Sequence, residues 1–106
     1  MGYVKFSTYS TAQLAKHIRT LAQNSANVVL TVHVKERMAQ RHVANTEVLE
    51  CLRLGTIRRT PEANDAKGSL ECRMERQVLK RALTCVVALC DENPNLLVVT
   101  VFEKNR

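Results

Sequence analysis

In the first half of the chain, hydrophobic residues recur every three or four positions, which is the spacing of one face of an α-helix. This spacing predicts three helices, at about 11–23, 32–41 and 45–54. Ser10 is expected to cap the first helix in a capping box with Gln13, and Thr31 to cap the second. Asn45 is expected to cap the third helix, and Gly55 to end it.

From Thr56 onward, the hydrophobic spacing changes to alternation, which is typical of β-strands. The strands are expected at 56–62, 69–77, 79–90 and 96–103. The polar segments 63–68 and 91–95 predict turns, and short connections of this kind join antiparallel neighbours. The third strand is apolar on both faces, which indicates a central strand that is covered on both sides. The segment 28–30 is interpreted as a short apolar approach to the second helix.

Because helices precede strands, the sequence predicts a two-layer α+β domain in which N-terminal helices pack on a four-stranded antiparallel sheet. A chain of 106 residues has the usual size of one domain. Residues 1–106 are therefore expected to form a single domain, with 1–27 as an N-terminal extension and helix. The core is expected to draw on both helices and strands: Leu14, Ile18, Leu21, Met38, Leu49, Leu52, Cys72, Cys85, Val87 and Val98.

The four cysteines do not fall at the spacing of a metal site. Cys72 and Cys85 lie in apolar strand patterns, which favours reduced thiols in the core. Free thiols, together with the lack of a signal peptide or a membrane-spanning run, predict a cytoplasmic protein without membrane association. A toxin domain that is released from a larger parent protein stays open as an alternative.

Sixteen Lys and Arg residues against ten Asp and Glu residues give the chain a net charge of +6. The positive charge is spread along the chain, which favours a folded basic face and an anionic partner. Nucleic acid is the commonest such partner, with RNA expected here and DNA as the alternative. Aromatic residues make up only 4% of the chain, which argues against recognition by base stacking.

The second predicted helix gathers three functional side chains on one side. At about 100° per residue, His33, Arg37 and Arg41 fall within one sector of about 80°. An imidazole titrates near neutrality, and guanidiniums are planar and permanently charged, so this sector is suited to handling a phosphate. The structural alternative is a solvated face, or an ion pair that buries Arg37 against Glu71 or Glu75.

Four motifs, in their order and spacing, carry a resemblance to a known family. They read L-T-x-H-x-x-x-R-M-x-x-R at 30–41, V-L-x-x-L-x-x-G at 48–55, K-G-S-L-x-C-R-M-E-R at 67–76 and V-V-T-V at 98–101. On these residues the chain resembles the bacterial and phage domain-of-unknown-function family 4258, over about 28–102. That family resembles the RelE, barnase and colicin-type (BECR) ribonucleases. The resemblance implies helices against a curved antiparallel sheet and RNA cleavage that needs no metal or other cofactor.

Cleavage at a 2′-hydroxyl needs a base, an acid and cations around the phosphate. His33 is the catalytic candidate for proton transfer, and Arg37 and Arg41 are the candidates that hold the phosphate. This helix sector is expected to converge with Arg73 on a concave surface where the helix meets the sheet. The nucleic-acid-binding candidates are four further residues: Arg73, Lys80, Arg58 and Thr100. For Thr100, a hydroxyl that is satisfied by the backbone is the alternative.

Two functions from different classes stay open. The first is a small basic toxin-like protein that acts as a metal-independent ribonuclease. The second is a non-catalytic module of phage or toxin–antitoxin type that binds nucleic acid or a host protein. No second histidine falls in the sector of His33, which leaves open whether the protein is an enzyme. An antitoxin, a host protein or a second copy of the chain are the protein partners considered.

Overall fold

The computed structural model describes residues 5–78 and 81–105 of the chain. Within these residues, three α-helices form: α1 (Thr11–Ala22), α2 (Val32–Arg41) and α3 (Asn45–Leu54). Two short 3-10 helices, η1 (Phe6–Thr8) and η2 (Ser25–Asn27), flank α1. The strands are β1 (Val28–Leu30), β2 (Thr56–Ile57), β3 (Glu62–Asn64), β4 (Ser69–Val78), β5 (Arg81–Cys90) and β6 (Asn93–Asn105). The three predicted helices are confirmed, and the first ends one residue earlier than expected.

The first two helices begin at the caps that the sequence predicts. The Ser10 hydroxyl accepts a hydrogen bond of 3.1 Å from the Gln13 N–H, and the Ser10 N–H donates to Gln13 Oε1 at 2.8 Å. The Thr31 hydroxyl accepts from the Val34 N–H at 3.3 Å. These bonds satisfy N–H groups that have no partner within the first turn of a helix.

The third helix begins differently from the prediction. Ala44 is the N-terminal cap, and Asn45 is already the first helical residue. The Ala44 N–H donates to Glu47 Oε1 at 3.4 Å, so a side chain from within the helix supports this start. Gly55 follows the last helical residue, as predicted, but with a φ of −76°. Its glycine identity reflects close packing, because a Cβ there would collide with the carbonyl oxygen of Cys51.

The predicted four-stranded antiparallel sheet is wrong, because the structure contains a six-stranded mixed sheet. Its strand order is β1-β6-β5-β4-β2, with β3 also paired to β4. β1 pairs with β6 in parallel, and the other neighbours are antiparallel. β1 has only three residues, all apolar, which are too few to show the alternating pattern by which a strand is predicted. Val28 and Leu30 nevertheless align with the buried Leu97 and Val99 of β6, so the segment 28–30 is a strand and not only an approach to α2.

The predicted strand at 56–62 is also divided in the structure. β2 pairs with β4 at Glu75 and Met74, and β3 pairs with β4 near its beginning. The residues between them include Pro61, which has no N–H to donate to a ladder. β6 begins at Asn93, so the predicted turn at 91–95 is shorter than expected. The start of the predicted third strand, at 79–80, lies outside the described residues.

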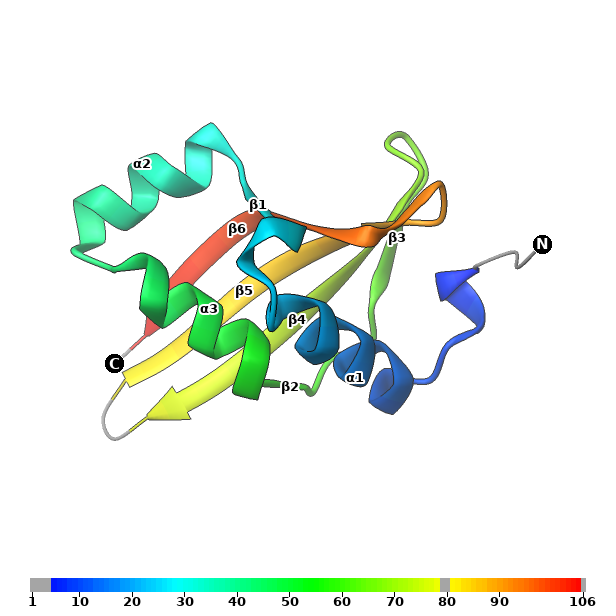
Figure 1. Cartoon of the computed structure of the whole chain (residues 1–106), viewed down its shortest axis with the longest axis horizontal. Coiled ribbons are helices and arrows are strands. Elements are labelled where there is room, and N and C mark those ends of the chain that lie inside the picture. Colours follow the sequence, from blue (N-terminus) through cyan, green and yellow to red (C-terminus); the bar gives the residue numbers. More distant parts are fainter. Residues whose placement is uncertain (1–4, 79–80, 106) are drawn as a thin grey trace.

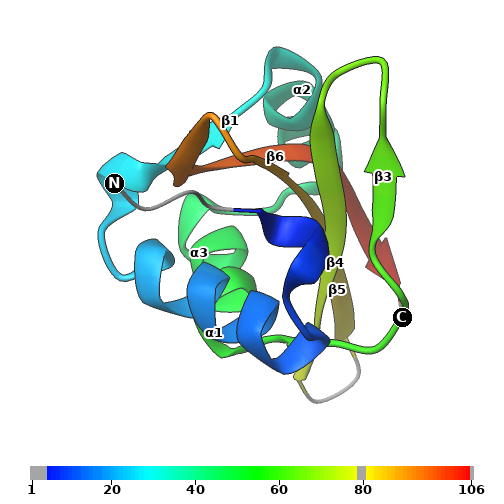
Figure 2. The same cartoon turned by 90° about the vertical axis from the view of Figure 1, so that its right-hand side faces the viewer.

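All three helices lie on one face of the sheet, which we call the covered face (Figure 1, Figure 2). Their buried residues form one core with alternate residues of β4, β5 and β6. Most predicted core residues are buried, and three are only half-buried: Leu21, Leu49 and Val98. Val98 points to the opposite face, which we call the open face, because its neighbours Leu97 and Val99 belong to the core.

The expectation that β5 is covered on both sides is confirmed by the burial of its side chains, although the covering differs between the two faces. On the open face, Val86 is 4% exposed and Thr84 is 8% exposed. Register places Val86 between Arg73 of β4 and Val101 of β6. Flanking strands on the open face therefore supply the neighbours of these residues, and no helix does so among the described residues. β5 is central, as predicted, since it pairs with strands on both sides.

The N-terminal segment is anchored to the core by an aromatic cluster. Phe6 is 1% exposed, and its ring lies 5.4 Å from that of Tyr9 and 5.0 Å from that of His17. His17 Nε2 lies 2.8 Å from the carbonyl oxygen of Pro94 in β6. The Phe6 N–H donates to Asp91 Oδ1 at 2.9 Å. These contacts fix α1 and η1 to the turn between β5 and β6.

The cysteines are free thiols, as predicted for Cys72 and Cys85. Cys51, Cys72 and Cys85 are completely buried, and Cys90 is half-buried. Burial raises the pKa of the Cys72 thiol to about 12. The fold therefore stabilises the protonated form of this thiol.

The free energy of unfolding is expected to fall as the pH rises from about 9 towards 12. The unfolded Cys72 thiol ionises above its ordinary pKa of 9.0, whereas the native thiol keeps its proton up to about 12. Urea unfolding across this range checks the expectation, with Cys72→Ala as the variant that lacks the thiol. An equally steep fall in Cys72→Ala would contradict it.

Candidate nucleic-acid interface

Packing and terminal hydrogen bonds fix the position of α2. Val34 is 0% exposed and Met38 is 7% exposed, and both join the core on the covered face, where α2 lies beside β6 (Figure 1). The helix ends at Arg41, and its C-terminal cap is His42, whose φ of 54° is left-handed. The Val43 N–H donates back to the Met38 carbonyl at 2.9 Å. Because Val34 and Met38 are fixed in the core, the exposed side chains of α2 have a defined orientation relative to the sheet.

The three catalytic candidates all lie on α2, on the side next to its buried residues. His33 and Arg41 are exposed, and Arg37 is half-buried. None of the three has a hydrogen bond or an ion pair with the residues that the structure describes. The alternative in which Arg37 is buried against Glu71 or Glu75 is therefore not found. Cationic side chains that lack a partner in the described part of the chain remain available to an anionic ligand.

Arg73 does not join this group, so the expected convergence is wrong. It lies in β4 between the buried Cys72 and Met74, and it pairs with Val86 of the next strand. Successive side chains of a strand point to opposite faces. Arg73 is therefore on the open face, whereas α2 packs on the covered face.

Two of the other nucleic-acid-binding candidates, Arg58 and Thr100, also lie outside α2. Arg58 is exposed in the connection between β2 and β3, rather than in a strand as expected. Thr100 lies at a β-bulge, because Val86 and Val87 pair with Val101 and Val99. The Thr100 hydroxyl donates to the Val86 carbonyl at 3.4 Å, which supports the structural alternative. Lys80 lies outside the described residues.

Lys35 is a cation of α2 that the sequence reasoning left out. It is exposed, and it follows the buried Val34 directly. At 100° per residue it lies on the opposite side of the helix from Arg37. Lys35 therefore lies outside the sector that holds His33, Arg37 and Arg41, although a ligand that crosses a helix can contact both sides. A count of all cations on α2 would have included it.

The fold and this site define an α+β domain with a six-stranded mixed sheet, helices on one face, and a helix that presents exposed cations. Residues 30–103 match the family described as Domain of unknown function (DUF4258). The chain belongs to this family. The match begins at the end of β1, so α1 lies before it. A search of curated proteins finds no match, and a search of solved structures finds none. Among the described residues, no helix combines the length and apolar character needed to cross a membrane.

Proposed function

We propose that this protein binds RNA through the phosphate backbone, with α2 as the contact surface. The observation that carries the proposal is that Arg37 and Arg41 are held on one helix side without a hydrogen-bond or ion-pair partner among the described residues. Guanidiniums donate paired hydrogen bonds to phosphate oxygens. The net charge of +6 supports an anionic ligand. The buried free thiols fit the reducing interior of a cell, where RNA is found.

Binding to a fluorescein-labelled unstructured RNA tests this function by fluorescence anisotropy. Arg37, Arg41 and Lys35 offer three phosphate contacts. Each contact contributes about −0.7 to the slope of log affinity against log salt for single strands, so a fourfold rise in salt should weaken binding by about twentyfold. An affinity that does not change with salt would contradict the proposal. Tighter binding to a DNA duplex than to RNA would overturn the choice of RNA.

Cleavage of the bound RNA is a second candidate function. His33 is exposed one turn before Arg37, so an imidazole and a guanidinium could reach neighbouring atoms of one phosphodiester. The resemblance of the family to metal-independent ribonucleases supports this candidate. Incubation of total RNA with wild type and His33→Gln, with and without a chelator, tests it. Cleavage that survives the chelator and is lost in His33→Gln is the expected result, and equal activity of both proteins would contradict it.

A further inference from the structure

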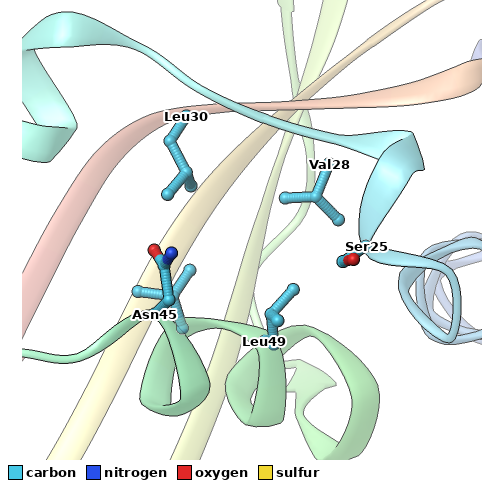
Figure 3. A pocket seen from close by; sticks show the side chains of 6 residues that line it. Ser25, Val28, Leu30, Asn45 and Leu49 are labelled. Atoms are coloured by element: carbon cyan, nitrogen blue, oxygen red, sulfur yellow. The ribbon is translucent and has the colours of Figure 1, made fainter.

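A small cavity separates the edge of the sheet from α3. Its volume is about 90 Å³, and it lies between β1 and the first two turns of α3 (Figure 3). The side chains of Val28 and Leu30 point from the strand towards the helix across this space (Figure 3). Residues from η2, β1 and α3 line it: Ser25, Val28, Leu30, Asn45, Val48 and Leu49. A cavity with apolar walls at a strand edge is suited to an inserted aliphatic side chain.

Among the residues that the structure describes, the outer edge of β1 has backbone groups without a hydrogen-bond partner. β1 is the last strand of the sheet on this side, and the Thr31 N–H donates to the Val99 carbonyl of β6. Alternate residues of a parallel strand bond to the same neighbour. The backbone groups of Val28 and Leu30 therefore point away from β6. The Val28 N–H donates to the Ser25 carbonyl within η2. The Val28 carbonyl and the Leu30 N–H have no partner within residues 5–78 and 81–105, so they are left as an acceptor and a donor for another strand.

The walls and ends of the cavity differ in polarity. Val48 is 1% exposed, whereas Val28 and Leu30 are only half-buried although they pack against the core. Ser25 and Asn45 stand at its ends, and their side chains have no hydrogen bond with the described residues. An incoming segment would therefore meet apolar contacts in the middle and polar groups at both ends.

The surface beyond Leu30 is basic. α2 starts at this end of the cavity and carries Lys35, Arg37 and Arg41 against a single acidic residue, Glu36. A second copy of the chain would bring two such helices and two charges of +6 together. Like charges at an interface are unfavourable. Charge complementarity therefore favours an acidic partner over self-association.

We infer that β1 and α3 form a docking groove for an extended, acidic segment of a partner protein. The segment adds to β1 as a further strand and places one aliphatic side chain in the cavity. Its acidic residues lie towards α2. The strand pairing and the cavity use the outer edge of β1 and the side of α3 that faces it, whereas the acidic residues of the segment share the cations of α2 with RNA.

Fluorescence anisotropy with labelled peptides tests the groove, on the full chain and without RNA. The probe is a short peptide of alternating valine and threonine with glutamates at both ends. Two control peptides are compared with this probe. The first has prolines at alternate positions, which removes backbone N–H donors, and the second has lysines in place of the terminal glutamates, which reverses the charge. The glutamate probe is expected to bind at least about tenfold more tightly than either control peptide, since each loses charged or backbone hydrogen bonds. Equal binding of the proline peptide would overturn strand addition.

Two tryptophan variants separate the groove from the rest of the surface. Asn45→Trp fills the end of the cavity from an exposed position, and Thr46→Trp is its exposed neighbour on the same helix. Asn45→Trp is expected to weaken probe binding about tenfold and Thr46→Trp less than about twofold, with both melting temperatures unchanged. On probe binding, the Leu30 amide should become protected from hydrogen exchange. Equal effects of the two variants would overturn the proposal, as would a dimer in solution that does not bind the probe.

Discussion

Replacement of Ile18 by alanine is expected to lower the free energy of unfolding by about 3 kcal/mol. Ile18 is 0% exposed in α1 and belongs to the same core as the strands. Truncation leaves a cavity that the surrounding side chains fill only in part. Arg53 of α3 also donates to the Ala22 carbonyl at 2.7 Å, and Arg19 donates to the Gly55 carbonyl at 3.2 Å. These bonds leave α1 little freedom to shift and close the cavity.

Urea unfolding measures this effect, with Thr20→Ala as the matched control on the exposed side of α1. The control is expected to change stability by less than about 0.5 kcal/mol. The comparison matters for the domain boundary, because the family match starts only at residue 30. A small effect of Ile18→Ala would mean that α1 is an appendage to the domain rather than part of its core.

The double charge reversal Arg37→Glu and Arg41→Glu is expected to weaken RNA binding by about a hundredfold. A hydrogen bond to a charged group contributes about 1.5–3 kcal/mol, which is roughly tenfold or more in affinity for each arginine. Stability should change little, because both guanidiniums lack partners among the described residues and exposed charges contribute little to folding. Anisotropy with the labelled RNA at low salt measures the loss.

The control for this pair is Lys16→Glu with Lys67→Glu, which makes the same change in net charge at exposed positions on α1 and on the turn between β3 and β4. If the control pair weakens RNA binding as much as the α2 pair, overall charge rather than α2 accounts for the affinity. A large fall in melting temperature for the α2 pair would instead indicate that the arginines are structural. Arg37→Lys refines the test, because an ammonium cannot donate the paired bonds of a guanidinium.

The helices could be predicted from the sequence, because their spacing and stops agree with the structure, as do the caps Ser10 and Thr31; only the cap of the third helix differs. Much of the sheet could not. β1 has three residues and no detectable alternation, so only its pairing with β6 in the folded chain defines it as a strand. The strand predicted at 56–62 is divided for two reasons. Pro61 cannot donate to a ladder, and β2 and β3 pair with different parts of β4. Burial of Val86 on the open face depends on neighbours from two other strands.

The candidate site shows the same limit. Spacing on one helix placed His33, Arg37 and Arg41 correctly on a common side, because the period of a helix is local. The relation of Arg73 to that helix is a tertiary property, and register puts it on the other face of the sheet. The role of Thr100 depends on a bulge between two strands, which sequence alternation does not reveal.

The most direct measurement of the central claim is an NMR titration of the backbone amides with unstructured RNA. We expect the largest shifts on α2, at His33, Arg37 and Arg41, and little change at Arg73 and Arg58. Shifts centred on Arg73 and its neighbours on the open face, with α2 unaffected, would contradict the claim that α2 is the RNA interface.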